Sequence, residues 1–154
     1  MTCERTSLRN AWAKWRRLAR SQRRLLLAAF ALLGVARLLV LLLPFRWLAW
    51  TLGRHMAEAR GPVSEYDRAL ALRVGRAVRS AAVHTPWRSV CLPQAVTAMW
   101  LLRRRCVPAT LYLGVAQRGR NREGLVAHAW VRCGDLVLTG AAGHRRYTIV
   151  STFS

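Results

Sequence analysis

Cys91 and His128 are the two residues of this chain whose types and sequence context suit nucleophilic catalysis. The thiolate is the reactive form of cysteine, and the dipole and unpaired N–H groups at a helix N-terminus stabilise its negative charge. Cys91 opens the stretch CLPQ, whose proline suits the first turn of a helix, so we expect the cysteine at a helix N-terminus. A nearby imidazole would hold the thiolate as an ion pair and then protonate a leaving amine. The pair therefore predicts a cysteine nucleophile with a histidine as its acid and base.

The other cysteines show no sign of a helix start, and the other histidines follow an apolar segment or lie in turns and loops. They are Cys3, Cys106, Cys133, His55, His84 and His144. For one cysteine and one histidine without further information, a structural role is the commoner outcome, and spacing alone does not exclude it. No Cys-x-x-Cys pair, zinc-type spacing or cleavable signal sequence is visible, so we expect free thiols in a reduced, cytoplasmic protein.

Helices and strands must position the two residues, and hydrophobic periodicity indicates where these elements lie. Apolar residues recur every three to four positions over residues 64–83, which predicts a helix with Ser64 as its N-cap. A further helix opens at Cys91 and ends before Pro108. Four β-rich segments follow, at residues 109–115, 125–132, 136–139 and 147–152. Helices followed by antiparallel strands predict an α+β fold.

The strand that contains His128 has two faces with different residues. Val126, His128 and Trp130 alternate along the segment and therefore share one of these faces. We expect that face to point at the helix that begins with Cys91. The predicted fold would then bring the imidazole towards the thiol.

Length and charge limit the organisation of the chain. Its 154 residues can bury one core, which we divide into a helical extension, residues 1–60, and a catalytic-type domain, residues 61–154. Twenty-six Lys and Arg against six Asp and Glu give a formal net charge of +20. This surplus favours acidic peptides, polyanions or anionic membrane surfaces as neighbours, although a solvated arginine-rich surface explains it equally well.

The apolar run at residues 25–45 is long enough to span about 30 Å of hydrocarbon. Arg37 interrupts the run and Pro44 stands at its far end, which makes insertion into a bilayer unfavourable. We therefore interpret the run as a buried or surface-lying helix in preference to a membrane span. Residues 8–24, with Trp12 and Trp15 among basic residues, predict a basic amphipathic helix that leads into it.

Several sequence strings resemble one enzyme family, the lasso peptide biosynthesis B proteins. The strings are PWRSVCLPQAVTAMWLLRRRCVPATLYLGV, AHAW, TGAAGHRRYTIVSTF and, nearer the N-terminus, LLLAAFALLGVARLLVLLLPFRWLAWTLG. The resemblance covers most of the chain from about residue 25 onward. It implies a transglutaminase-like, papain-like cysteine peptidase core, with Cys91 in SVCLPQA and His128 in AHAW at the catalytic positions.

The resemblance leaves the third catalytic position open. Transglutaminase-like enzymes usually carry an aspartate on the strand after the histidine strand, but this chain has Leu138, Thr139 and Gly140 there. Asp135, at a turn, is the nearby acid that could orient the imidazole or simply cap the hairpin. A backbone carbonyl or an amide side chain could orient it instead, because the group only holds a tautomer.

Two groups are candidates to stabilise the oxyanion that forms during acyl transfer. The backbone N–H of Cys91 lies at its helix terminus, where it is free to donate. The side chain of Gln94 lies one turn further on, although a surface or capping role is commoner for such a residue. Neither candidate involves a metal or a cofactor.

The resemblance also implies a function, the removal of the leader from a ribosomally made lasso peptide precursor in bacterial antibiotic biosynthesis. It implies three partners, namely the precursor, a separate small leader-recognition protein and an ATP-dependent macrolactam synthetase. No nucleic acid or cofactor is expected, whereas association with a membrane surface remains open. A transglutaminase-like acyltransferase and a non-catalytic, membrane-associated or polyanion-binding adaptor are the alternatives.

Overall fold

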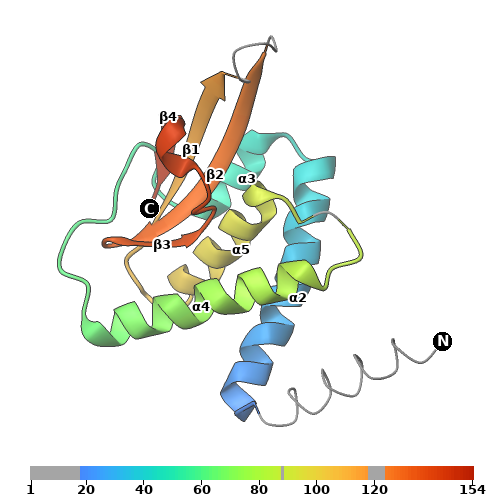
Figure 1. Ribbon diagram of the computed structural model, residues 1–154, viewed down its shortest axis with the longest axis vertical. Helices are drawn as coiled ribbons and strands as arrows, with labels where there is room; N and C mark the ends of the chain where they lie inside the picture. Colours follow the sequence, from blue (N-terminus) through green and yellow to red (C-terminus); the bar gives the residue numbers. More distant parts are fainter. Residues whose placement is uncertain (1–17, 88, 118–123) are drawn as a thin grey trace.

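A computed structural model describes residues 18–87, 89–117 and 124–154 (Figure 1). In these ranges helices precede strands, which confirms the predicted α+β fold. The elements are α2 (Arg20–Leu42), α3 (Phe45–Leu52), α4 (Glu65–Val83), α5 (Cys91–Arg103), β1 (Thr110–Gln117), β2 (Leu125–Cys133), β3 (Leu136–Thr139), the 3-10 helix η1 (His144–Arg146) and β4 (Thr148–Phe153). Most of the amphipathic helix predicted for residues 8–24 lies outside the described residues.

Local signals explain where the helices begin and end. The Ser64 hydroxyl accepts a hydrogen bond from the Asp67 backbone N–H at 3.0 Å, so the predicted N-cap of α4 is confirmed. The acidic residues Glu65 and Asp67 lie in the first turn, where they stabilise the positive end of the helix dipole. Helix α2 ends at Leu42 because Pro44, two residues later, lacks the N–H needed to continue it.

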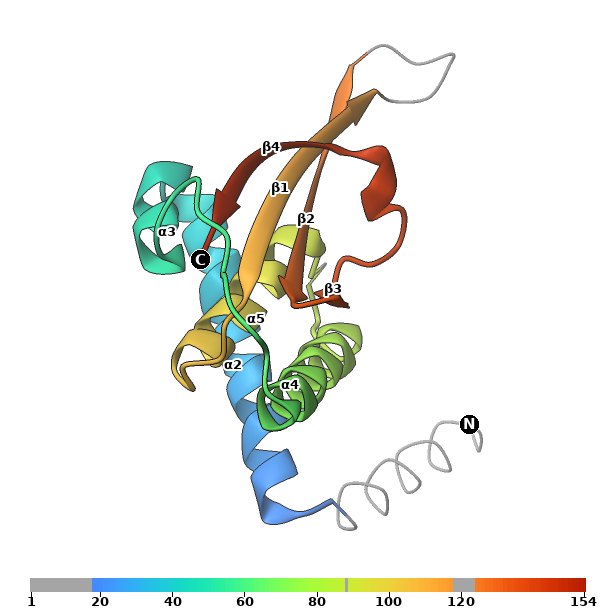
Figure 2. The same ribbon diagram turned by 90° about the vertical axis from the view of Figure 1, so that its left-hand side faces the viewer.

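The four strands form one antiparallel sheet in the order β3-β2-β1-β4. β1 pairs along its full length with residues 125–132 of β2, and Gly114 lies opposite His128. The short strand β3 pairs only with the end of β2, from Val131 to Cys133. On the far edge, the Arg54 N–H donates to the Ser154 carbonyl at 2.8 Å, so the chain after α3 extends the sheet beyond β4. Figure 2 shows this arrangement from the side.

A single hydrophobic core joins the helices to one face of the sheet. Its members include Leu33 of α2, Leu52 of α3, Val78 of α4, Leu102 of α5 and Val131 of β2. In Figure 2, α5 lies between α2 and the sheet, and α4 runs beneath the β3 side. The core therefore crosses residue 60, and the division into an extension and a domain stays a prediction.

Helix α2 covers most of the apolar run that was predicted as a buried or surface-lying helix. Leu25, Ala29, Leu33 and Ala36 recur on one side of it and are fully or nearly fully buried. By length and composition α2 could also cross a membrane, although a core helix of a soluble protein passes the same test. The helix packs against α4 and α5, so one face of it belongs to the protein core.

Candidate active site

Cys91 is the first residue of α5, as predicted, and its free thiol is half-buried beside the helical core. No side chain caps this helix, since Val90 occupies the N-cap position. Pro93 has no N–H, and the N–H of Gln94 donates weakly to the Val90 carbonyl at 3.5 Å. The geometry of a helix start therefore leaves the backbone N–H groups of Cys91 and Leu92 for a ligand.

The side chain of Gln94 forms a hydrogen bond with the loop that precedes α5. Its Nε2 donates to the Ser89 carbonyl at 2.7 Å. The hydroxyl of Thr85 shares a hydrogen bond of 2.8 Å with the Ser89 hydroxyl and donates to the Trp87 carbonyl at 3.0 Å. The amide nitrogen of Gln94 is thus bonded to the loop before the helix, and its role as an oxyanion donor stays a prediction.

His128 lies in the middle of β2, and its ring is half-buried. Its Nε2 donates to the Gly140 carbonyl at 2.8 Å, because a carbonyl can only accept. This hydrogen bond fixes the tautomer of the neutral ring and leaves Nδ1 as the acceptor. The ring also stacks on Tyr147, with 4.8 Å between centroids, and on Trp130, with 5.9 Å. A backbone carbonyl, one of the predicted alternatives, therefore orients the imidazole.

The shared face of His128 and Trp130 is confirmed, but the expected direction of that face is wrong. Ala129 and Val131 alternate with these residues and pack into the core with the helices. A Cβ added at Gly114, opposite His128, would meet Tyr147 and Trp130, which places the rings on the other face of the sheet. Among the described residues, no hydrogen bond joins the Cys91 thiol to the His128 ring.

The structure does not bring Asp135 to His128. Both Asp135 oxygens accept from the Arg68 guanidinium of α4, at 2.5 and 3.1 Å, and both side chains are exposed. The hydrogen bond from Arg68 lowers the pKa of Asp135 below its usual value, and the pKa of Arg68 is raised. Five steps of strand β2 separate His128 from Cys133, about 16 Å at 3.3 Å per residue, and Asp135 follows in the turn beyond. In this structure Asp135 links the β2–β3 turn to α4.

An aromatic cluster on the outer face of the sheet surrounds His128, and the sequence alone did not reveal it. Tyr112 stacks on Trp130 with 5.5 Å between centroids and an interplanar angle of 6°. Burial is the main cause that raises the pKa of Tyr112. The His144 ring also lies near Trp130, with 6.0 Å between the ring centroids. The alternating rings of His128 and Trp130 in β2 were the available signal, whereas the contribution of the loop between β3 and β4 depends on tertiary structure.

The structure has a sizeable cavity, but it lies away from Cys91 and His128. A cavity of about 590 Å³ opens between α3 and the end of β4, and neither Cys91 nor His128 lines it. Within residues 18–87, 89–117 and 124–154, no group of three or more His, Cys, Asp or Glu side chains is placed to hold a metal ion.

Of three comparisons with known proteins, one found a match. The family model described as the transglutaminase-like superfamily matches residues 39–152, a span that runs from the end of α2 into β4 and contains Cys91 and His128. No curated protein and no solved structure matched the chain. The matched span covers well over half of the sequence and the whole sheet but its last residue. The chain therefore belongs to the transglutaminase-like superfamily, whose members are typically cysteine-dependent enzymes.

Proposed function

We propose that this protein is a cysteine peptidase that removes the leader from a lasso peptide precursor. The observation that carries the proposal is the free, half-buried thiol of Cys91 at the first position of α5, inside a transglutaminase-like fold. The superfamily includes cysteine peptidases and acyltransferases. The strings around Cys91 and His128 that resemble the lasso B proteins favour the peptidase and suggest its substrate.

In the proposed reaction the Cys91 thiolate attacks the carbonyl carbon of the peptide bond that ends the leader. The negative charge moves to the carbonyl oxygen, where the N–H groups of Cys91 and Leu92 can stabilise it. The tetrahedral intermediate collapses to a thioester as the C–N bond breaks, and His128 gives a proton to the departing amine. Water then hydrolyses the thioester, which frees the leader carboxylate and restores the thiol.

The reaction requires that the imidazole and the thiol come within hydrogen-bonding distance once the precursor is bound. In the structure His128 is held by the Gly140 carbonyl and by stacking on Tyr147. Because the ring lies on the outer face of the sheet, away from the core side where Cys91 packs, this step requires a rearrangement when the precursor binds, beyond the tightening that catalytic hydrogen bonds commonly show. The oriented Nε2–H leaves Nδ1 as the atom that would exchange the proton with the thiol.

The test is mass spectrometry of a lasso precursor that is incubated with the protein and a leader-recognition protein. Wild-type protein is expected to release the leader, and Cys91→Ala and His128→Ala are expected to release little or none. Cys106→Ala is the matched control, because Cys106 is an exposed free cysteine after the end of α5. Release of the leader by both Cys91→Ala and His128→Ala would refute the assignment.

The same experiment separates the two alternative functions from the peptidase. An acyltransferase would pass the acyl group to an added primary amine, which gives a leader amide in place of the free acid. A non-catalytic adaptor would leave processing unchanged in Cys91→Ala. The peptidase predicts the free acid in the presence of the amine and no product from the folded Cys91→Ala protein.

The proposed partners are the precursor, a leader-recognition protein and a macrolactam synthetase that uses the freed core peptide. The arginines at the end of α5 could contact an acidic leader or partner surface. Arg103 already donates to the Thr51 carbonyl at 3.2 Å, and Arg105 donates to the Leu101 carbonyl at 2.9 Å. Charge reversal at Arg104 is therefore the sharper test, and unchanged precursor binding in Arg104→Glu would exclude this contact.

A further inference from the structure

The outer sides of α2 and α3 carry an unusual concentration of exposed apolar residues, which we call the α2–α3 face. Leu42 is 75% exposed and Trp50 is 84% exposed. Ten of the seventeen exposed large hydrophobic side chains in the described residues lie here, namely Leu27, Phe30, Val35, Leu38, Leu41, Leu42, Leu43, Phe45, Trp47 and Trp50. On α2 they lie on the side of the helix opposite the buried stripe that contains Leu25 and Leu33.

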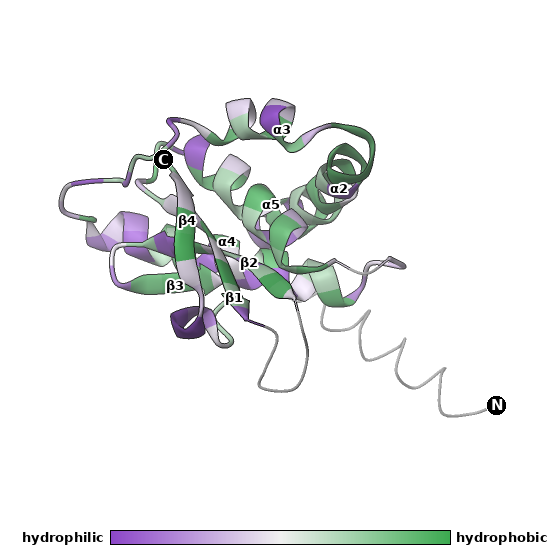
Figure 3. Ribbon diagram, turned by 90° about the horizontal axis from the view of Figure 1, so that it is seen from above, coloured by the Kyte–Doolittle hydropathy of each residue, from purple (hydrophilic) through white to green (hydrophobic). Residues whose placement is uncertain are grey.

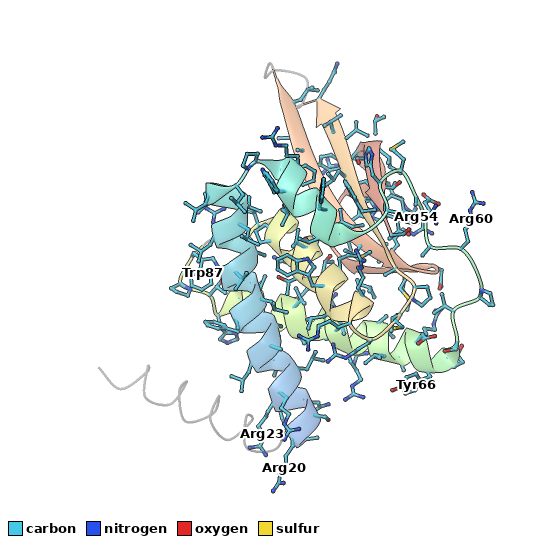
Figure 4. The ribbon with its side chains drawn as sticks, turned by 180° about the vertical axis from the view of Figure 1, so that it is seen from behind. Arg20, Arg23, Arg54, Arg60, Tyr66 and Trp87 are labelled. Carbon is cyan, nitrogen blue, oxygen red and sulfur yellow. The ribbon has the colours of Figure 1, made fainter. Side chains whose placement is uncertain are left out.

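The charges on this part of the chain are all of one sign. Residues 18–57 contain no Asp or Glu, whereas the same segment contains six arginines, namely Arg20, Arg23, Arg24, Arg37, Arg46 and Arg54. Figure 4 shows α2 in front of the other helices, with Arg20 and Arg23 at its N-terminal end and Arg54 near the end of α3. A face of apolar side chains whose only charged neighbours in this segment are arginines suits a partner that combines apolar groups with negative charge.

The tryptophans of α3 add a second feature of membrane-surface helices. Trp47 and Trp50 lie on the solvent side with 6.3 Å between their ring centroids, and the Arg46 guanidinium lies 6.0 Å from the Trp47 ring. Tryptophan and arginine are favoured at the headgroup level, where an apolar body and a polar group are both accommodated. Figure 3 shows α2 coloured mainly as hydrophobic, whereas along α3 hydrophobic residues alternate with more hydrophilic ones.

We propose that the α2–α3 face binds the surface of an anionic lipid bilayer, with α2 lying in the interface and not crossing it. A crossing would carry the neighbouring face of α4 into hydrocarbon. Arg73 and Arg76 of α4 line a hollow with Leu25 and Leu26 of α2, and Arg73 donates to the Ser21 hydroxyl at 3.4 Å. Burying these arginines in the bilayer is unfavourable, whereas a parallel α2 leaves them in water.

A second copy of the chain is a poorer occupant of the same face. Two such faces would bring twelve arginines together with no carboxylate from residues 18–57 to compensate them. Anionic headgroups supply the missing negative charge. The sheet, with His128 on its outer side, lies on the other side of α5 from α2, so the bilayer would leave the aromatic cluster open to a soluble peptide (Figure 2).

The experiment is co-sedimentation of the full chain, without detergent, with vesicles of phosphatidylglycerol and phosphatidylcholine in equal parts or of phosphatidylcholine alone. The proposal predicts binding to the anionic vesicles that falls by at least about tenfold in the Trp47→Ser/Trp50→Ser variant. The matched control is Tyr66→Ser/Val83→Ser on α4, where the side chains are 77% and 82% exposed, and it should bind as wild type does. A second variant, Arg20→Gln/Arg24→Gln, should weaken binding and its dependence on salt concentration.

Each remaining outcome would overturn the proposal. Equal binding of wild type to both vesicle types would remove the role of anionic lipid. Protein that resists release by alkaline carbonate would be inserted across the bilayer. A lipid-free dimer, seen by light scattering and abolished by the tryptophan variant, would make the face a protein interface. Loss of binding in the control variant would show that the surface is not specific.

Discussion

The hydrogen bond from His128 Nε2 to the Gly140 carbonyl determines how the imidazole can act. It is the kind of contact that an aspartate makes in a catalytic triad, since it holds the ring and its tautomer without accepting the proton. Gly140 has a φ of 67°, and an added Cβ would lie 2.3 Å from the Ala129 carbonyl oxygen. This position thus requires glycine, and the loop that follows β3 brings its carbonyl to the ring.

Asp135→Asn tests whether a carboxylate takes part in orienting His128. The structure predicts processing within about twofold of wild type, because Asp135 pairs with Arg68 in an exposed and solvent-screened position. The measurement is the rate of leader release by mass spectrometry. A loss comparable to that of His128→Ala would mean that Asp135 moves to the ring during catalysis.

The same variant has a predicted pH dependence of stability. Arg68 lowers the pKa of Asp135 in the folded state, so the stabilising contribution is present above the unfolded pKa and is lost as the pH falls through the folded pKa. The difference in melting temperature between wild type and Asp135→Asn should therefore shrink on acidification. Thermal unfolding followed by circular dichroism measures this, and a difference that grows towards acid pH would contradict it.

At the scale of elements, the starts of helices could be predicted from the sequence because the signals are local. Ser64 before an acidic first turn marks the beginning of α4, and CLPQ marks the beginning of α5. The orientation of β2 could not be predicted in the same way. Ala129 and Val131 on one face and Trp130 on the other are all apolar, so alternation defines two faces without showing which one the helices cover.

Ser64→Ala tests the contribution of the N-cap to α4. Loss of the side-chain acceptor for the Asp67 N–H is expected to destabilise the protein by about 1 kcal/mol. Ser80→Ala, an exposed position in the same helix, is the matched control and should be neutral or slightly stabilising, because alanine favours helix. Chemical denaturation of the three proteins provides the comparison. Equal stability of Ser64→Ala and wild type would show that the cap contributes nothing.

At the scale of the whole molecule, α2 is both part of the core and the support of an exposed apolar face. Its hydrophobicity could be seen in the sequence, but its dual role could not, because both sides of the helix are apolar. Leu33 is fully buried among residues of the helices and the sheet, whereas Leu42 on the outer side is 75% exposed. Only the packing of α4 and α5 distinguishes the two sides.

Leu33→Ala tests the structural role of α2. The variant should lose about 2–5 kcal/mol of unfolding free energy, because the substitution removes buried methyl groups and leaves a cavity. Leu42→Ala, the same substitution on the outer side, should change the unfolding free energy by no more than about 0.5 kcal/mol in lipid-free buffer. Denaturant unfolding measures both values. Similar losses of unfolding free energy in the two variants would show that the buried side of α2 does not belong to the core.

The identity of the nucleophile determines the function of the whole molecule, and it can be observed directly. Intact-protein mass spectrometry after brief mixing with a lasso precursor should reveal an adduct of the leader acyl group on wild-type protein. Peptide mapping should place the adduct on Cys91, and hydroxylamine should remove it, as expected for a thioester. The Cys91→Ala protein should show neither adduct nor released leader, while Cys106→Ala should show both. Leader release by Cys91→Ala at the wild-type rate, or an adduct at another residue, would contradict the account.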